Sequence, residues 1–439
     1  LWPAIYWHQW MIVQQPSNGS SANNHLLGEM AGLFISTVEW PYFLQSAKWR
    51  EMSRNVLEKE IVKQTFPCGL NKEQAFSYHL FSLEFFLLAG IEGDRYGFTF
   101  SPTYKLWIRR MLEVIPVMTD FGGNLPRFGD ADEGMALQLR PITSSRTDWL
   151  YRLGLTWLHA AVPVPNEGSG EMTASFLWKG ALPRAKPKRF SRRKISLEDA
   201  GYFLLTSRRG QPDEIFCLAD AGPLGYLSIA AHGHADALSF TVHIGGVPVI
   251  VDPGTFIYHA DPVWRAYFRG TKAHNTLTVD NLDQSVAQGA FLWKTHARSK
   301  VLKWVETSQG GKLVAEHDGY SRLPGKIIHR RAISLNDKRL VTEDELLGGG
   351  KARAQYRLHF APDCHVRLQD FTCAVEWAAG ALLINLDRNL EWSVVRGGED
   401  AGWYSSRFGV KEPTCTLIGE YEGEIPIKML NQMEVFHAN

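Results

Sequence analysis

Residues 238–252, LSFTVHIGGVPVIVD, decide the fold class of the second half of the chain. Branched and aromatic residues recur there in two short runs, and the pair Gly245-Gly246 separates the runs. Such runs are typical of β-strands, because branched and aromatic side chains pack well on a pleated sheet. The stretch therefore predicts two short strands that are separated by a turn.

The same strand-like pattern continues from about residue 198 onward. It recurs, for example, in GYFLLTS (201–207), EIFCLAD (214–220), RLVTEDEL (339–346) and ALLINL (381–386). Residues 1–161 instead carry apolar residues three or four apart, which predicts helices. We expect Asn71 to be the N-cap of a helix through Phe76 and Leu83, and Ser101 to open the next helix. Helices followed by strands predict an α+β chain with separate α and β domains.

A boundary falls between these halves, at residues 162–197. Pro163, Pro165 and Gly168 interrupt regular structure, and residues 184–194 hold seven basic residues and no acidic one. A run of like charge is typical of a solvated linker, although a patch for an anionic polymer stays open. We therefore expect three parts, namely a helical domain at 1–161, a linker at 162–197 and a β domain at 198–439.

The composition excludes several classes of protein. The 439 residues include 47 Lys and Arg and 46 Asp and Glu, a balance that argues against a general nucleic-acid binder. A hydrophobic content of 45% is typical of a globular protein rather than a disordered one. The sequence contains no apolar run of about 18 residues, the length that would predict a transmembrane helix. The five cysteines form no CxxC motif, and the 15 tryptophans fit either large cores or sugar-stacking surfaces.

The residues between 228 and 280 hold the strongest chemical signal. His234, Asp252 and His274 are separated by 18 and 22 residues, so a loop and two strand ends could bring them to one zinc ion. Hydrogen-bonded core histidines are the alternative. Residues i and i+2 of an extended segment share a face, so His232 and His234 could serve substrate and metal, with Asp236 orienting one of them.

The helical half has a polar cluster of its own. His25 and Glu29 lie four residues apart on one predicted helix face, which resembles half of a metal site, although the HExxH pattern is absent. A capped helix start is the alternative interpretation of this pair. Tyr78 lies in an apolar helical pattern, where a tyrosine is normally a core residue with a hydrogen-bonded hydroxyl.

Several motifs together resemble one family. HGHADALSF (232–240), DPGTFIY (252–258) and AHNT (273–276) resemble the β domain of heparinase II/III-like polysaccharide lyases. ANNHLLGE (22–29) and EQAFSYH (73–79) resemble motifs of their α/α-toroid domain. The resemblance implies a partial α/α toroid followed by an antiparallel β-sandwich. The family includes lyases for heparin and heparan sulfate, alginate, and chondroitin or hyaluronan.

The resemblance also implies a reaction and its residues. These lyases cleave a 4-linked uronic acid by β-elimination, after the C5 carboxylate has been neutralised. Asn24, His25 and His232 match the neutralising and active-site residues, and Tyr78 and Tyr258 match the acid and base. Tyr267, on the same loop as Tyr258, stays an alternative.

Further roles follow from the same resemblance. The family's zinc ligands correspond to His234, Asp252 and His274, and that zinc looks structural. The residues expected to line the cleft or to contact substrate are Glu29, Arg127, Arg265 and Arg269.

The resemblance implies an acidic polysaccharide partner and a periplasmic or secreted protein. We further expect that the chain lacks the first toroid helices and that a signal segment lies outside it. Two other functions stay open, namely a non-catalytic carbohydrate-binding or exopolysaccharide-assembly protein and a metal-dependent hydrolase. The hydrolase would need an open metal position and a water molecule.

Overall fold

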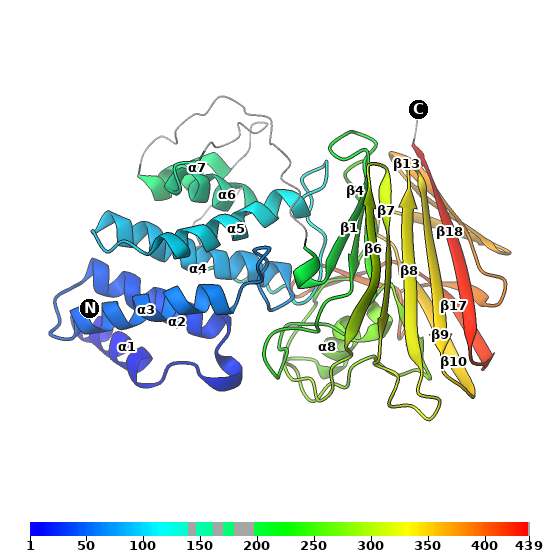
Figure 1. Ribbon diagram of the computed structural model, residues 1–439, viewed down its shortest axis with the longest axis horizontal. Helices are drawn as coiled ribbons and strands as arrows, with labels where there is room; N and C mark the ends of the chain where they lie inside the picture. Colours follow the sequence, from blue (N-terminus) through cyan, green and yellow to red (C-terminus); the bar gives the residue numbers. More distant parts are fainter. Residues whose placement is uncertain (139–145, 161–169, 180–196, 438–439) are drawn as a thin grey trace. The chain divides into compact units, whose positions relative to one another are not determined.

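The computed structural model describes residues 1–138, 146–160, 170–179 and 197–437 (Figure 1). The chain divides into two compact units, each of which is described by itself. The helical unit contains Leu1–Val117 and Gly134–Asp199, and the strand-rich unit contains Met118–Glu133 and Ala200–Asn439. Residues 118–133 thus belong with the strands, although helices precede and follow them in the chain.

Seven α-helices form the described part of the helical unit. They are α1 (Trp2–Gln14), α2 (Asn24–Glu39), α3 (Ser46–Lys63), α4 (Phe76–Arg95), α5 (Pro102–Met118), α6 (Arg146–Trp157) and α7 (Gly170–Trp178). Helix α2 packs against α1, α3 and α4, while α6 packs against α4 and α7. Phe34 of α2 and Phe86 of α4 are fully buried in this core. Burial of these apolar faces stabilises the helices more than their intrinsic propensity does.

The helix starts show which predicted caps are formed. Ser101 Oγ accepts a hydrogen bond from Tyr104 N at 3.1 Å, as expected for a cap of α5. The prediction for Asn71 is wrong, because α4 begins only at Phe76. Gln74 has a φ of 57°, a left-handed conformation that interrupts any helix between Asn71 and Phe76. Asn71 instead accepts a hydrogen bond from the backbone of Glu73 at 2.9 Å.

The strand-rich unit consists of antiparallel sheets (Figure 1). One sheet has the order β1-β2-β3-β4, a second has the order β14-β17-β10-β5, and an eight-stranded sheet has the order β11-β12-β13-β18-β9-β8-β7-β6. A small fourth sheet pairs β15 with β16. The strands are β1 (Tyr202–Ser207), β2 (Ile215–Asp220), β3 (Phe240–Ile244), β4 (Val247–Ile250), β5 (Leu277–Val279), β6 (Ser299–Thr307), β7 (Gly310–His317), β8 (Ile328–Asn336), β9 (Arg339–Leu347), β10 (Lys351–His359), β11 (His365–Gln369), β12 (Thr372–Trp377), β13 (Gly380–Asn385), β14 (Glu391–Arg396), β15 (Trp403–Arg407), β16 (Val410–Pro413), β17 (Cys415–Glu424) and β18 (Ile427–His437).

One continuous apolar core joins the three larger sheets. Leu205 of β1, Leu358 of β10 and Ile384 of β13 are fully buried members of this cluster. Side chains alternate between the faces of a strand, so each sheet contributes its inward-facing residues. The predicted order of helices followed by antiparallel strands is therefore confirmed.

A short helix, α8 (Pro262–Arg269), lies within the strand-rich unit, between β4 and β5. Its start is capped by Asp261, whose side chain accepts hydrogen bonds from Val263 N and Trp264 N. The 3₁₀ turn Thr271–Ala273 follows and leads into β5. Arg265 and Arg269 thus lie on α8, and His274 follows directly after the 3₁₀ turn.

Part of the expected linker forms regular structure. Residues 170–178, within the range 162–197, form α7, whereas the basic run at 184–194 lies outside the described residues. Among the helices that the structure describes, none is both long enough and apolar enough to cross a membrane.

Candidate functional site

Four buried side chains gather in the strand-rich unit as a candidate metal site. His234 and Asp236 lie on the loop before β3, Asp252 follows β4, and His274 follows the 3₁₀ turn after α8. One candidate ligand atom from each residue lies within 4.8 Å of those of the others. The structure thus brings together all three predicted ligands and adds Asp236, which the sequence suggested only as an orienting residue.

The imidazole nitrogens of this group fit a metal. His234 Nδ1 and His274 Nε2 are buried and have no hydrogen-bond partner. The other nitrogens are engaged, since His234 Nε2 is 3.0 Å from Asp130 Oδ1 and His274 Nδ1 is 2.7 Å from Asp252 Oδ2. A carboxylate can only accept, so each engaged nitrogen carries a proton, and in the neutral form of each ring a lone pair is left on the other nitrogen. Two lone pairs beside carboxylates form a donor set that suits Zn²⁺.

The backbone between the two histidines explains the Gly in the motif. A Cβ at Gly233 would lie 1.5 Å from the carbonyl oxygen of Leu224, so no larger residue fits without movement of the chain. Trp293 Nε1 donates a hydrogen bond to Gly233 O at 3.0 Å and fixes the same turn. This close approach sets the directions in which His232 and His234 leave the loop.

Asp130 connects His234 with His232. Its carboxylate contacts His232 Nδ1 at 3.2 Å and pairs with both terminal nitrogens of Arg265, one of them at 2.8 Å. Burial alone would raise the pKa of Asp130, but Arg265 and the hydrogen bonds from His232 and His234 outweigh burial and hold that pKa well below its ordinary value. The residue lies in the segment 118–133, within the stretch GDADEG (129–134).

Aromatic rings surround the predicted tyrosine Tyr258. The rings of Phe291 and Phe408 each lie 4.9 Å from it between centroids, and the ring of His232 lies 6.5 Å away. The guanidinium carbon of Arg265 is 4.9 Å from the Tyr258 centroid, within the range of a cation–π contact. Tyr258 thus lies close to a histidine and to an arginine, and both of these contact Asp130.

The three arginines that were predicted to contact substrate each donate hydrogen bonds to backbone carbonyl groups. Arg265 and Arg269 are buried, and both donate to the carbonyl oxygen of Ala290. Arg127 donates to the carbonyl oxygens of Ser405 and Ser406. These bonds hold backbone segments in place, and substrate contact by the three guanidinium groups stays a prediction.

A second polar group lies in the helical unit. Asn24 Nδ2 lies 3.2 and 3.0 Å from the two carboxylate oxygens of Glu73, and Asn24 N donates to the same carboxylate at 3.1 Å. Both residues are buried, whereas His25 beside them is exposed. Tyr78 is buried in the first turn of α4, five residues after Glu73. The structure thus links the Asn-His motif with the segment that carries the predicted tyrosine.

The neighbouring residues of this group have structural partners. Glu29 accepts hydrogen bonds from Ser17 N at 2.7 Å and Ser17 Oγ at 2.6 Å, which ties the chain before α2 to the helix. His79 accepts from Asn71 N at 3.3 Å and donates to Met111 O at 3.2 Å. Burial lowers the pKa of His79 to about 4, so this ring is neutral near neutral pH.

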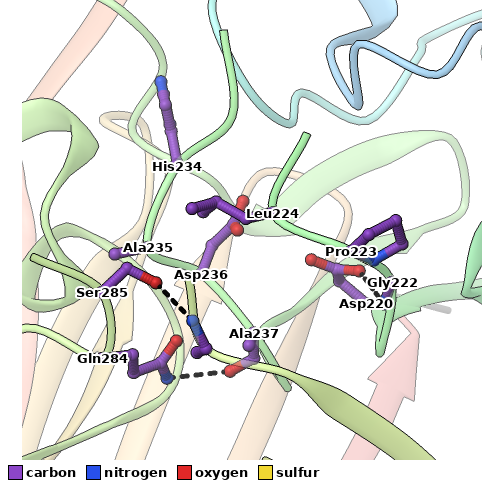
Figure 2. Close-up of a pocket in the computed structure, with 11 residues that line it drawn as sticks. Asp220, Gly222, Pro223, Leu224, His234, Ala235, Asp236, Ala237, Gln284 and Ser285 are labelled. Atoms are coloured by element: carbon purple, nitrogen blue, oxygen red, sulfur yellow. Dashed lines mark hydrogen bonds between the residues drawn. The ribbon is translucent and has the colours of Figure 1, made fainter. Parts of the chain in front are cut away.

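A small pocket with an empty volume of about 220 Å³ opens beside the candidate metal group (Figure 2). Asp220 and Asp236 line it, and Gln284 closes one side by donating to the carbonyl oxygen of Ala237 at 2.9 Å. Burial, and then the charge of Asp236, raise the pKa of Asp220 well above its ordinary value. Asp220 therefore favours its protonated form beside Asp236.

Sequence comparison identifies the family. The family model described as Heparinase II/III-like, C-terminal matches residues 190–430, and the Heparinase II/III N-terminus matches residues 14–148. The chain belongs to the heparinase II/III-like family.

The similar curated proteins are lyases. A heparin-sulfate lyase of Pedobacter heparinus is 26% identical over 291 residues, which cover 65% of this chain and 40% of that protein. A heparin-sulfate lyase of Bacteroides stercoris is 24% identical over 78% of this chain and 46% of its own length. The chain thus spans less than half the length of these relatives.

Solved structures support the fold. A crystal structure of heparinase III matches with a TM-score of 0.74 and 17% identity, over 98% of this chain and 63% of that chain. Heparan sulfate lyase HepC from Pedobacter heparinus matches with a TM-score of 0.69 and 19% identity, over 96% and 61% of the two chains. The predicted fold class, a helical toroid region followed by antiparallel β-sheets, is confirmed by these matches together with the order of elements.

Proposed function

We propose that the protein is a polysaccharide lyase that cleaves a uronic-acid-containing glycosaminoglycan of the heparan sulfate type by β-elimination. One observation carries the proposal, namely that one family member has both groups of candidate residues. The first group is the Asn24–Glu73 pair with His25 and Tyr78. The second is His232, which Asp130 holds near Tyr258. The curated relatives that are heparin-sulfate lyases support the substrate class.

The chemistry requires three events, and the chain has a residue for each. The uronate carboxylate must be neutralised so that the proton on C5 becomes acidic, and Asn24, His25 and His232 are proposed as its hydrogen-bond donors. A tyrosine oxygen then takes the C5 proton, and the electron pair of the C–H bond forms the C4–C5 double bond. The bond from C4 to the glycosidic oxygen breaks, and an acid protonates the departing oxygen. Tyr78 and Tyr258 are proposed as this base and acid.

Tyr258 is a better candidate than Tyr267 for the second tyrosine. Tyr258 lies beside His232 and Arg265, with the His232 ring 6.5 Å and the Arg265 guanidinium carbon 4.9 Å from its ring centroid. Burial raises the pKa of Tyr267 to about 12, which disfavours ionisation near neutral pH. We therefore assign the catalytic role on this loop to Tyr258.

We also propose that His234, Asp236, Asp252 and His274 bind Zn²⁺. The two buried imidazole nitrogens without a partner and the adjoining carboxylates support this assignment. The metal would join the loop before β3, the end of β4 and the start of β5, and would thereby brace the segment that carries Tyr258. A structural zinc of this kind contributes to folding.

Product analysis tests the function. The purified protein is incubated with heparan sulfate, chondroitin sulfate, hyaluronan and alginate, and the ultraviolet absorbance of the unsaturated uronate is followed. We expect new absorbance with heparan sulfate and a loss of at least ~100-fold in Tyr78→Phe, as for removal of a general acid or base. Tyr96→Phe is the matched control, because Tyr96 is an exposed tyrosine at the end of the same helix.

The other outcomes separate the competing functions. Binding of polymer without any product would indicate a carbohydrate-binding or exopolysaccharide-assembly protein. Cleavage without an unsaturated product, unaffected by Tyr78→Phe, would indicate a hydrolase. Absorbance with alginate alone would retain the lyase mechanism and overturn the proposed substrate class. We also propose the periplasmic or secreted location that the family implies, which fractionation of cells expressing the full-length protein would test.

A further inference from the structure

The carboxylate of Asp130 is the shared hydrogen-bond acceptor of two histidines with different proposed roles. It contacts His234 Nε2 at 3.0 Å through Oδ1 and His232 Nδ1 at 3.2 Å through Oδ2. One of these rings belongs to the candidate metal group and the other to the candidate catalytic group. The side chain of Asp130 is fully buried, so water does not compete for these bonds.

We propose that Asp130 is a positioning residue that orients both rings at once, an inference that rests on the proposed lyase function. A carboxylate that accepts from His234 Nε2 leaves His234 Nδ1 as the nitrogen with a lone pair, which is the atom without a partner in the structure. The same carboxylate fixes the proton of His232 on Nδ1 and directs His232 Nε2 away from Asp130. Asp130 thus selects the nitrogen that each ring presents to its ligand.

The chain around Asp130 is held independently of this carboxylate. Asp120 Oδ2 contacts His243 Nδ1 at 2.8 Å, and Asn124 Nδ2 donates to Gly246 O at 2.6 Å. The backbone of Asp130 itself donates to His232 O at 2.9 Å. The position of Asp130 is therefore set by bonds of the preceding segment and by its own backbone N–H, and this backbone presents the carboxylate to the rings.

Arg265 completes the arrangement. Its guanidinium group pairs with both oxygens of Asp130, and its Nε donates to Ala290 O at 3.0 Å. The two parallel bonds from Arg265 keep the carboxylate anionic and hold it in one orientation. This orientation suits acceptor contacts to two rings. This use of Arg265 also explains why it is buried rather than open to substrate.

The first test uses the unaltered protein. Nitrogen-15 NMR of labelled histidine reports which ring nitrogen carries hydrogen, and His232→Gln and His234→Gln proteins assign the signals. We expect the proton of His234 on Nε2 and a proton of His232 on Nδ1. A proton on His234 Nδ1, with none on His234 Nε2, would overturn the proposal. This measurement does not depend on enzymatic activity.

The second test compares Asp130→Asn with Asp120→Asn. Loss of an outer carboxylate beside a metal-bound histidine typically lowers metal affinity or activity about 10- to 100-fold. We expect Asp130→Asn to weaken zinc affinity by that factor in chelator competition and to lower kcat with little change in KM. Asp120→Asn removes the bond to His243 in the same segment, and it should keep metal affinity and kcat.

The outcomes distinguish this inference from the proposed function. Equal losses in the two variants would overturn it, because attachment of the segment rather than the Asp130 carboxylate would then be responsible. Unchanged metal affinity and kcat in Asp130→Asn would overturn it as well. If the unaltered protein cleaves no polymer, the lyase function fails, while the NMR and zinc measurements still decide whether Asp130 orients the rings. If Asp130→Asn does not fold, the NMR result on the unaltered protein decides.

Discussion

The pair of Glu73 and Asn24 allows a quantitative prediction for Glu73→Gln. The carboxylate of Glu73 accepts from Asn24 N at 3.1 Å and from Asn24 Nδ2 at 3.2 and 3.0 Å. A glutamine keeps one acceptor and turns an amide N–H₂ group toward these donors, so at least one charged hydrogen bond is lost. Such bonds contribute about 1.5–3 kcal/mol when buried. We expect the helical unit to lose about 2 kcal/mol of stability.

Urea unfolding followed by circular dichroism measures this loss, and a double-mutant cycle isolates the pair. Asn24→Ala, Glu73→Gln and the double variant should give a coupling energy of about 1–2 kcal/mol, within the range for residues in direct contact. Asn55→Ala, an exposed asparagine in the same unit, is the control and should be near neutral. A coupling energy near zero would refute the reasoning, because Glu73 would then not hold Asn24. We also expect Glu73→Gln to lower kcat, since the Asn24 amide would no longer be fixed.

Three further predictions concern a pH dependence, the metal and a glycine. Folding lowers the pKa of His79 from 6.5 to about 4. As the pH falls from 6.5 toward 4, the unfolded chain therefore takes up a proton at His79 before the folded chain does. The free energy of unfolding should decrease by roughly 3 kcal/mol over this pH range. His79→Gln should show a shallower pH slope in urea unfolding, and equal slopes would contradict the assignment. Asp252→Asn should lower the zinc content of the protein. It should also lower the melting temperature, by roughly 2–4 °C for each kcal/mol of stability that is lost. A chelator should lower the melting temperature of the unaltered protein and leave that of the variant unchanged. Gly233→Ala should cost about 1–3 kcal/mol because its Cβ meets Leu224 O, whereas Gly32→Ala, in open space on α2, should stabilise. Equal melting temperatures for the two alanine variants would show that the contact at Gly233 relaxes.

Local patterns predicted most of the strands. Apolar and branched runs such as 202–207 and 215–220 form β1 and β2 almost to the residue. The prediction of Asn71 as an N-cap was wrong for a local reason too. Gln74 has a left-handed backbone conformation, and a glutamine side chain does not indicate such a conformation. The order of helices and strands was therefore readable from spacing alone, whereas the start of α4 was not.

The candidate site was only partly readable. His234, Asp252 and His274 were found through residue type and resemblance, and Asp236 lay inside the same motif. Asp130 had no such signal, because it is 102 residues from His232 and its own surroundings resemble an ordinary turn. Long-range pairing of this kind follows from the three-dimensional path of the chain, which no periodicity encodes.

The strand-rich unit is discontinuous in sequence, and this limits how it can be exchanged between proteins. Residues 118–133 are separated from residue 200 by the chain of α6 and α7. A fragment that begins at residue 198 would lack Asp120, Arg127 and Asp130. The groups that these residues bind on β3, on β15 and in the HGH loop would stay in the fragment and lose those bonds. A chimera between two relatives therefore has to take residues 118–133 from the same parent as the sheets. Joining residue 133 to residue 200 by a linker would give the unit a single continuous chain.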